Sequence, residues 1–307
     1  MAQIIVDNDV SRIKTIIREV FGTDQIVHIE RLGGLTNHSY KVQLPNQDTY
    51  VIRLPGDGTE ELINRTDERI STELACELGI DTALLYFGQN GVKISKYINK
   101  AHTLSAEDMR IDDNLKKVAR ILRTLHTCGK DTKVPFEIFT MAQDYEQIIK
   151  NNAVPLFEDY EQTKRTVMEI KAAADRVSEG GNVPCHNDPL CENWVMDGSG
   201  RLYLIDWEYA GMNDGMWDLA DVSIEAGLSA EHDAALLHHY FGRPPKINET
   251  MRFMANKVYL DFLWSLWRKA RVPFDGDAMD EYGTQRYVRL QENIDAFAKT
   301  FMGKEVL

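Results

Sequence analysis

The sequence predicts an α+β protein of two lobes, in which an antiparallel β-sheet lobe precedes a larger helical lobe. Short apolar segments with alternating character, separated by turn residues, recur as far as about residue 95. Apolar residues at helical spacing dominate the rest of the chain, apart from a short β-rich insertion that carries polar residues. We therefore expect one domain over residues 1–95 and a second over residues 96–307.

In the first domain, a helix is expected over residues 12–21, where four apolar residues recur at helical spacing. A turn of composition Pro-Asn-Gln-Asp at residues 45–48 joins two strands. A second helix is expected over residues 62–78, ending before Gly79. The expected strands cover residues 26–32, 40–44, 49–54, 84–87 and 92–97.

In the second domain, Ser105 and Asp108 have the spacing of a capping box and are expected to start a helix that Gly129 ends. Another amphipathic helix is expected over residues 157–179. From Asp218 onward the pattern is helical. Between these helices, a compact β insertion is expected, with strands at residues 183–186, 194–196 and 202–205.

The composition restricts the class of protein. The net charge of −13 disfavours nucleic acid as a partner and favours a cationic substrate, although acidic surfaces also aid solubility. No apolar run approaches the roughly 20 residues of a membrane span, and residues 1–10 lack the apolar core of a signal peptide. The four cysteines show no metal-type or redox-type spacing. We expect a cytoplasmic protein with reduced thiols and no membrane insertion.

The strongest chemical signal is Cys-His-Asn-Asp-Pro-Leu-Cys-Glu-Asn at residues 185–193, followed by Leu-Ile-Asp-Trp-Glu at residues 204–208. Phosphoryl transfer to an alcohol needs a base for the hydroxyl group and oxygen ligands for Mg²⁺. Asp188 offers a loop carboxylate and is the predicted base. Asn193 and Asp206, which ends a predicted strand, are the predicted magnesium ligands.

Three further residues are expected to support this chemistry. Glu208 is expected to assist through a second metal ion or a water molecule, and His186 to brace the loop by hydrogen bonds. Asp218 is expected to cap the following helix or to brace the catalytic loop. The alternative is that Asp188 and Asn193 only form turns in a hairpin loop.

Residues 185–193 and 204–213 resemble the choline/ethanolamine kinases, within the aminoglycoside-phosphotransferase-like kinases of the protein-kinase-like fold. The resemblance runs from about residue 32 to about residue 287, and residues 63–68 resemble the bacterial choline kinases. It implies a bilobal fold with ATP and Mg²⁺ as cofactors. The residues that fit this branch better than the antibiotic-resistance branch are Glu208, Tyr209, Asn213, Asp218 and Glu225.

The resemblance also implies an ATP site. The glycines of residues 32–37 resemble a phosphate-covering loop, in which backbone N–H groups approach phosphates closely. Arg53 stands where protein kinases carry lysine and would contact the α- and β-phosphates, with Glu68 as its partner and Glu73 as the alternative. Three hinge residues would bond adenine through their backbone. The implied ATP-binding residues are Gly33, Gly34, Thr36, Asn37, Arg53, Glu68, Lys96, Tyr97 and Ile98.

The acceptor that the resemblance implies is choline. A quaternary ammonium group has no hydrogen-bond donor and is held by aromatic faces and carboxylates. Trp264 and Trp267 are three residues apart and share a helix face, although such a pair is usually core in isolation. The implied choline-binding residues are Tyr209, Glu225, Trp264, Trp267 and Tyr282, with Glu225 as the counter-charge.

The predicted reaction is therefore ATP plus choline giving phosphocholine and ADP. Ethanolamine, thiamine or an aminoglycoside are the alternative acceptors for the same fold. A catalytically inactive binding module is a further alternative, against which the intact Arg53, Asp188, Asn193 and Asp206 argue. No Asp-Phe-Gly or Ala-Pro-Glu segment bounds an activation loop, which disfavours a protein kinase.

Overall fold

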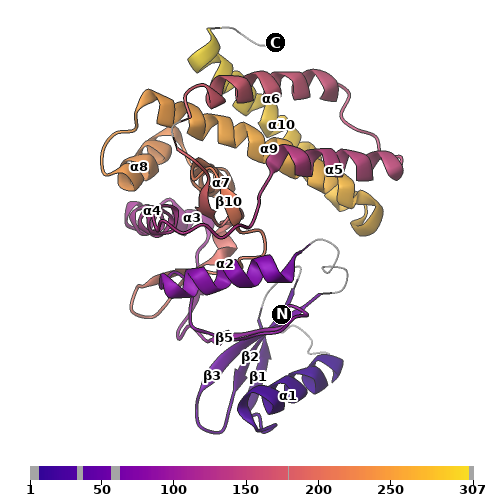
Figure 1. Ribbon diagram of the computed structural model, residues 1–307, viewed down its shortest axis with the longest axis vertical. Helices are drawn as coiled ribbons and strands as arrows, with labels where there is room; N and C mark the ends of the chain where they lie inside the picture. The colour runs from indigo at the N-terminus through magenta and orange to yellow at the C-terminus, as the bar shows by residue number, and fades with distance from the viewer. Residues whose placement is uncertain (1–6, 33–36, 57–62, 179, 304–307) are drawn as a thin grey trace. The chain divides into compact units, whose positions relative to one another are not determined.

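The computed structural model describes residues 7–32, 37–56, 63–178 and 180–303. The chain packs as two compact units (Figure 1): residues 1–104 with 192–210, and residues 105–191 with 211–307. The first unit contains an antiparallel sheet and the second is mostly helical, so the predicted α+β class is confirmed. Residues 192–210 pack with the first unit. The predicted boundary between the two functional lobes, after residue 95, stays a prediction.

The sheet of the first unit has five antiparallel strands in the order β1-β2-β3-β5-β4. The second strand begins earlier than predicted, because Asn37 to Ser39 pair with the end of β3 although they are polar. Backbone hydrogen bonds extend this strand, and the pattern of side chains does not predict them. The strands are β1 (His28–Arg31), β2 (Asn37–Gln43), β3 (Thr49–Pro55), β4 (Leu84–Phe87) and β5 (Lys93–Lys96).

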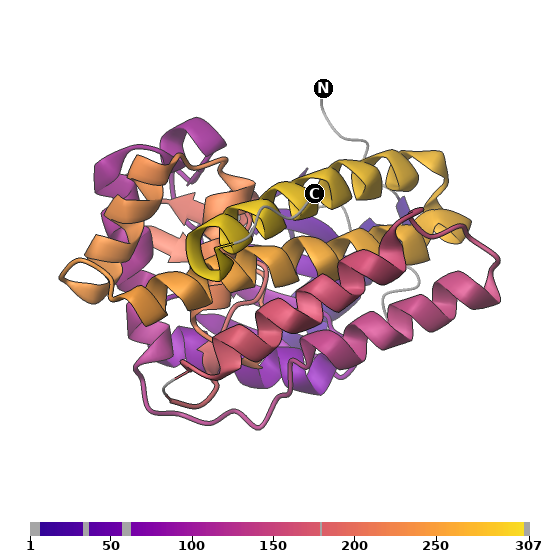
Figure 2. The same cartoon turned by 90° about the horizontal axis from the view of Figure 1, so that it is seen from above.

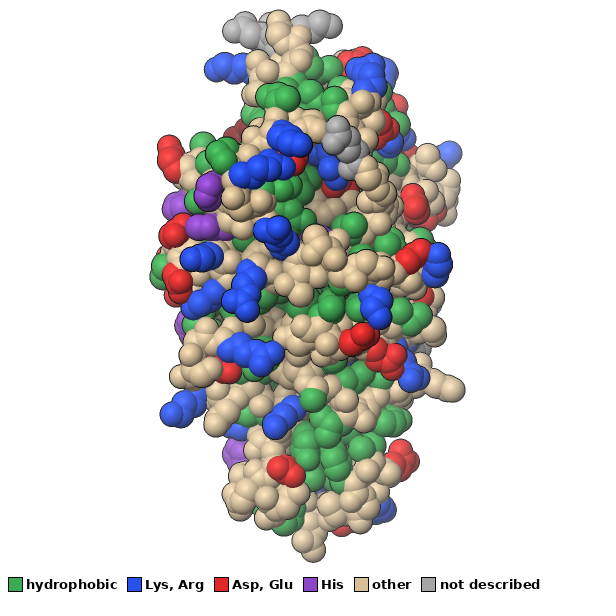
Figure 3. Space-filling model, turned by 60° about the vertical axis from the view of Figure 1, so that its left-hand side comes forward, with side chains coloured by type: hydrophobic (Ala, Val, Ile, Leu, Met, Phe, Trp, Pro, Cys, Tyr) green, Lys and Arg blue, Asp and Glu red, His purple; other side chains and the backbone are tan. Residues whose placement is uncertain are grey.

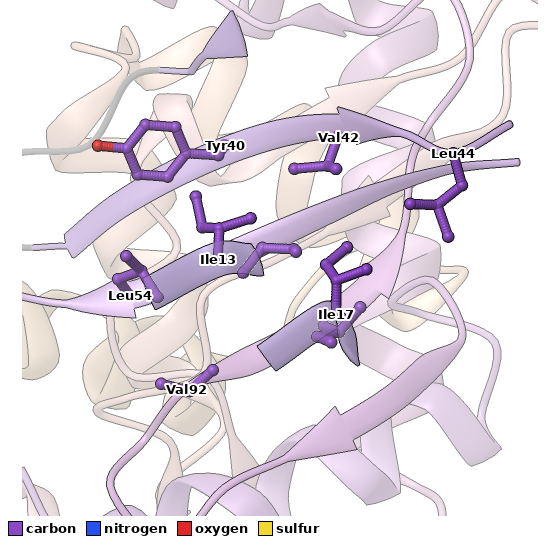
Figure 4. Packing of buried hydrophobic residues seen from close by; sticks show 9 residues of the cluster. Ile13, Ile17, Tyr40, Val42, Leu44, Leu54 and Val92 are labelled. Carbon is purple, nitrogen blue, oxygen red and sulfur yellow. The ribbon is translucent and has the colours of Figure 1, made fainter. Parts of the chain in front are cut away.

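Two helices flank this sheet (Figure 1). Helix α1 (Asp7–Phe21) packs the buried Ile13 and Ile17 against the apolar face of the sheet (Figure 4). Ile52 and Leu54 of β3 belong to this core. Because side chains alternate along a strand, Arg53 between them points to the opposite face, toward helix α2.

Helix α2 (Arg65–Glu77) begins three residues later than predicted. Asn64 caps it, since its side-chain oxygen accepts hydrogen bonds from the backbone N–H groups of Thr66 and Asp67. An N-cap of this kind satisfies donors that the first helical turn leaves open. The cap therefore places Glu68 in the first turn of the helix, on a buried position.

The predicted single β insertion is wrong. Strand β7 (Val183–Cys185) pairs in the second unit with β10 (Gly211–Asn213), which the sequence analysis did not predict. The other two predicted strands, β8 (Trp194–Met196) and β9 (Leu202–Leu204), form a three-stranded sheet of the first unit with β6 (His102–Thr103). Strands of three residues carry too little pattern to specify a partner, so distant backbone hydrogen bonds decide the pairing.

The predicted helix from Ser105 to Gly129 is broken. The capping box of Ser105 and Asp108 is present, but it starts the short helix α3 (Ala106–Met109), and α4 (Asp112–His126) follows separately. The side chain of Asn114 donates to the carbonyl of Asp108 at 2.8 Å and so satisfies the end of α3. This bond stabilises the interruption between α3 and α4, which the apolar stripe alone does not indicate.

The second unit is built around helix α9, which packs against α5, α6, α7 and α10. Figure 2 shows α9 and α10 running side by side. The predicted helix over residues 157–179 is shorter and corresponds to α6. The helices are α5 (Ile138–Asn151), α6 (Tyr160–Asp175), α7 (Met216–Glu225), α8 (Ala230–Phe241), α9 (Ile247–Asp275) and α10 (Asp277–Phe297), followed by a π-helical turn (Ala298–Met302).

The surface is mixed in charge. On the face that Figure 3 presents, lysine and arginine side chains are interspersed with acidic and apolar ones, so the net charge of −13 is not an even acidic coat. Within the described ranges, no helix combines the length and the apolar character that crossing a membrane requires.

Candidate active site

Arg53 of β3 lies at the centre of a cluster of charges in the first unit. Its guanidinium is 2.5 Å from Glu68 and 3.2 Å from Asp206, and 4.0 Å from Glu208. Arg53 and Glu68 are 4% and 1% exposed, so their ion pair is desolvated. The predicted contact of Arg53 with Glu68 is confirmed, whereas Glu73 pairs with an arginine on the exposed face of α2.

A second arginine completes this cluster and was missed by the sequence analysis. Arg65 lies 2.7 Å from Glu68 and 3.6 Å from Glu208. Asn37 of β2 also donates to Glu208, at 3.0 Å. The helical spacing of Arg65 and Glu68 was the available signal. Two guanidinium groups thus face three carboxylates, which leaves the cluster with surplus negative charge when all of them are ionised.

The carboxylates of Asp206 and Glu208 follow directly after β9. The backbone of Asp206 has a φ of 70°, a left-handed conformation that is uncommon outside glycine. Burial, and then the charge of Asp206, raise the pKa of Glu208 to about 7. The two carboxylates therefore repel each other, and a divalent cation would relieve that repulsion.

The oxygens in this segment fit Mg²⁺, a hard cation that takes oxygen ligands. Asn193, which carries an amide oxygen, is the last residue of the 3-10 turn (Cys191–Asn193) before β8 and belongs to the same unit. Its carbonyl accepts the N–H of Ile205 at 3.0 Å, which ties this turn to the residue before Asp206. Residues with carboxylate and amide oxygens thus lie on two connected pieces of backbone.

In the second unit, Asp218 of α7 holds the loop that leads to Asp188. Its buried carboxylate accepts the backbone N–H groups of His186 and Asn187, each at 2.8 Å. The predicted bracing contact is confirmed. The capping role is wrong, because α7 has Gly215 at its N-cap and no side-chain cap.

The loop itself has a strained backbone. Asn187 has a φ of 66°, and its side-chain oxygen accepts a hydrogen bond from Asn213 at 2.9 Å. Its carbonyl accepts the indole N–H of Trp217 at 2.9 Å. The ring Nδ1 of His186 accepts the N–H of Asp188 at 3.3 Å, as the predicted bracing role requires. These bonds together fix the backbone that carries the partly buried Asp188.

His126 of α4 contacts the same carboxylate of Asp218 that binds the loop. The sequence did not predict this residue. Its Nε2 lies 3.0 Å from Asp218, and its Nδ1 lies 2.9 Å from the hydroxyl of Tyr240. Gly215 leaves room for the ring, since a Cβ there would approach Nδ1 to 2.8 Å. The thiol of Cys185 lies within 4.8 Å of the ligand atoms of His126 and Asp218. Burial raises the pKa of this thiol, which favours hydrogen-bonded support over metal binding.

The predicted aromatic residues of the second unit come together. The rings of Trp264 and Trp267 contact each other edge to face, with centroids 6.2 Å apart. Tyr282 of α10 lies near them, and the guanidinium of Arg268 lies over the rings of both Trp267 and Tyr282. Tyr209 belongs to the first unit, so its place in this group stays a prediction.

Glu225 does not stand free as a counter-charge. Its carboxylate is bound by Arg286 of α10, which also lies 3.4 Å from Asp261 of α9. Arg286 also lies over the ring of Tyr282, 5.5 Å from its centroid. The charge of Glu225 is therefore already balanced within the chain, which the sequence analysis did not foresee.

A family model described as choline/ethanolamine kinase matches residues 29–286 of this chain. The chain belongs to the choline/ethanolamine kinase family. It is similar to the choline kinase LicA from Streptococcus pneumoniae, at 32% identity and a TM-score of 0.81, covering 94% of this chain and 100% of the other. Protein LicA of Haemophilus influenzae is 27% identical over 83% of this chain and 76% of its own length.

Proteins with much lower sequence identity share this fold. A mutant aminoglycoside 2'-phosphotransferase-IIIa in complex with GDP has a TM-score of 0.67 at 14% identity, which shows a shared fold alone, over 92% of this chain and 96% of the other. The chain is thus an ATP-dependent kinase of the predicted family and fold. The reading as a member of this family is confirmed, whereas the roles of individual residues stay predictions.

Part of the kinase's predicted ATP site lies outside the described residues, namely Gly33, Gly34 and Thr36. In the predicted hinge, the N–H of Lys96 bonds to a carbonyl at 2.9 Å and its own carbonyl accepts from Thr82 at 3.0 Å. The N–H of Tyr97 donates to the carbonyl of Thr49 at 3.2 Å. These groups are already used within the first unit, and the adenine contact of the hinge stays a prediction.

Asp221 of α7 is a further residue of the kinase that sequence analysis missed. It lies three residues after Asp218 and four before Glu225, so the three share a helix face. It is 1% exposed, and neither carboxylate oxygen has a hydrogen-bond partner among the described residues. Burial, and then the charges of Glu225 and Asp188, raise its pKa well above the usual range, while Arg286 opposes this.

The raised pKa of Asp221 predicts a pH dependence of stability. The folded kinase keeps this proton where the unfolded chain has lost it, so the free energy of unfolding falls as pH rises above about 4, by up to about 1.4 kcal/mol per pH unit from this group. In Asp221→Asn the side chain no longer titrates, so this part of the decrease in the free energy of unfolding should disappear. Urea unfolding at pH 5 and pH 8 should show that the free energy of unfolding of the variant, relative to that of the wild type, is higher at pH 8 than at pH 5.

The matched control is Asp113→Asn, at an exposed position of α4 that is paired with Lys117. This variant should keep the wild-type pH dependence, apart from a small surface effect. If Asp221→Asn also keeps it, Asp221 is ionised in the folded kinase and the interpretation of its burial is wrong.

Proposed function

We propose that this kinase transfers the γ-phosphoryl group of ATP to the hydroxyl of choline, giving phosphocholine and ADP. The observation that carries the proposal is the aromatic group of Trp264, Trp267 and Tyr282. Its ring faces already accept a cation, since the Arg268 guanidinium lies 4.7 Å and 4.1 Å from two of their centroids. Faces of this kind are suited to a quaternary ammonium group.

Asp188 is the proposed base. It accepts the proton of the acceptor hydroxyl while that oxygen bonds to the γ-phosphorus, and the bond from phosphorus to the β–γ bridging oxygen breaks. The electron pair of the broken bond leaves with ADP. The hydrogen bonds that Asp218 accepts, and that Asn213 and Trp217 donate, at the residues before Asp188 support this role, because a fixed base needs little reorganisation.

Arg53 is proposed to contact the α- and β-phosphates, with Glu68 and the newly found Arg65 orienting it. Asn193 and Asp206 are proposed to hold Mg²⁺, assisted by Glu208. When bound, this ion offsets the phosphate charge that develops during transfer. The proposed nucleotide site further includes Gly33, Gly34, Thr36, Asn37 and the hinge residues Lys96, Tyr97 and Ile98. Because ATP is the donor, we propose a cytoplasmic location.

Ethanolamine is the second candidate acceptor, and one observation favours it. Its ammonium group carries N–H donors, and Asp221 has two buried carboxylate oxygens without a hydrogen-bond partner among the described residues. Choline remains the preferred acceptor because the aromatic faces suit a methylated cation, and because Glu225 is already bound by Arg286. No contact among the described residues favours thiamine or an aminoglycoside.

The experiment that tests the proposal is a coupled assay of ADP release with choline, dimethylethanolamine, ethanolamine and thiamine. We expect kcat/KM to decrease from choline through dimethylethanolamine to ethanolamine, because each lost methyl group removes contact with the rings and adds an N–H donor. A preference for ethanolamine would refute choline as the acceptor and leave the kinase chemistry intact.

Replacing Trp267 with leucine tests the aromatic group. Leucine keeps apolar bulk and removes the ring quadrupole, so the KM for choline should rise by about 30-fold, the equivalent of a desolvated cation–π contact of roughly 2 kcal/mol. The smaller ring in Trp267→Phe should recover part of this loss. The measurement is kcat/KM for the three alcohols in both variants.

A tryptophan that serves only the core would behave differently. Its loss would lower stability and impair all three alcohols equally. An equal loss in Trp267→Leu would therefore remove Trp267 from the acceptor site.

A further inference from the structure

Arg268 stands between two rings of the proposed acceptor site. Its guanidinium carbon lies 4.1 Å from the centroid of Tyr282 and 4.7 Å from that of Trp267. Both distances lie within the roughly 6 Å over which a cation is attracted to a ring face. The faces proposed for the ammonium group of the acceptor are thus covered by a cation of the chain itself.

The neighbouring arginines are held differently. Arg271 pairs with Asp275 at 2.7 Å, Arg289 with Asp261 at 2.7 Å, and Arg286 with Glu225. No carboxylate of the described residues lies within 4 Å of the Arg268 guanidinium, which donates a hydrogen bond to the sulfur of Met279 at 3.1 Å and also interacts with the hydroxyl of Tyr282. Thioether sulfur is a weak acceptor, so the ring faces are the main partners of this cation.

The packing of α10 on α9 brings Tyr282 to Arg268. Gly283, next to Tyr282, lets the two helices approach closely, since a Cβ there would lie 3.1 Å from the Cβ of Arg268 and 3.4 Å from the carbonyl of Ser265. Arg268 is only partly buried. Its long side chain therefore has a route to water, and leaving the rings breaks no ion pair with a side chain that the structure describes.

We propose that Arg268 is a competing cation that lowers the affinity of this kinase for its acceptor. The inference rests on the proposed function: an acceptor gains the faces of Trp267 and Tyr282 only when the guanidinium withdraws. The apparent affinity for the acceptor is then reduced by the fraction of molecules in which the rings are covered. A trimethylated ammonium group covers more ring surface than a primary one, so it recovers more of the free energy that displacement of Arg268 costs.

The test compares Arg268→Gln with the wild type in calorimetric binding of choline and of 3,3-dimethylbutan-1-ol, its uncharged carbon isostere. Removing the competitor should lower the Kd for both ligands, by about 5- to 30-fold for choline. Arg268→Lys should improve binding less, because a strongly hydrated ammonium stacks on rings less well but still competes. Urea midpoints near that of the wild type would show that the variants are folded.

Arg271→Gln is the matched control. Arg271 lies on the same helix, carries the same charge and also lies over a ring, that of Phe274, but it is paired with Asp275. Its replacement should leave both Kd values unchanged.

Three outcomes would overturn the inference. An unchanged or higher Kd for choline in Arg268→Gln excludes competition. A lower Kd for choline without a change for the uncharged isostere points to simple charge repulsion in place of competition for the rings. If neither the wild type nor the variant binds choline, the choline proposal fails and this inference fails with it, whereas choline binding by the wild type alone isolates the failure to Arg268.

Discussion

Replacement of Asp188 with asparagine is expected to lower kcat by about 10²- to 10⁴-fold, the usual contribution of a positioned general base. Asparagine keeps the shape of the side chain and cannot accept the hydroxyl proton. The backbone N–H of Asp188 is bound by the ring of His186. Asp218 and Trp217 bind the backbone of the two preceding residues, so the loop should keep its conformation in the variant. Affinity for Mg-ATP should therefore be preserved.

Asp206→Asn should differ from Asp188→Asn in one measurable respect. It should also lower turnover by orders of magnitude, but with weaker binding of the magnesium nucleotide, because it removes charge from the proposed metal ligands. Steady-state kinetics with choline and calorimetry with Mg-ADP separate the two variants. Near-normal turnover in either variant would refute the role assigned to that carboxylate, and Asp113→Asn should match the wild type in both measurements.

Loss of Arg53 is expected to have the second large effect. Arg53→Met leaves Glu68, Asp206 and Glu208 without their shared guanidinium, and breaking a buried ion pair of this kind costs about 3–5 kcal/mol of stability. The same change should raise the KM for ATP, since the proposed contact is to phosphate. Arg53→Lys should recover only part of both losses, because lysine lacks the planar fork of the guanidinium.

Arg69→Met is the matched control, since Arg69 lies on α2 and pairs with Glu73 at the surface. This exposed pair should contribute at most about 1 kcal/mol. Urea unfolding measures the stability of each variant, and ATP and choline titrations at a temperature where all are folded measure the two KM values. An Arg53→Met enzyme with a normal KM for ATP would show that the third strand was aligned wrongly with the family.

Much of the fold followed from local patterns in the sequence. Alternation predicted the strand that carries Arg53, and helical spacing predicted the contact of Trp264 with Trp267. These features depend on residues within a few positions of one another. Element ends were less predictable, because caps such as Asn64 and bonds such as that from Asn114 to Asp108 depend on single side chains.

By itself, the sequence determined the chemical types at the candidate site and their order along the chain: the loop of Asp188, the oxygens of Asn193 and Asp206, and the resemblance that the family match confirmed. Only the tertiary structure decided which partners these residues have. His126 reaches Asp218 across 92 positions and Arg53 reaches Asp206 across 153, and the packing of α10 on α9 brings Tyr282 to Arg268. Periodicity reports which face of an element is apolar, whereas the partner of a buried charge depends on how distant segments pack, and desolvation then makes that choice energetically decisive.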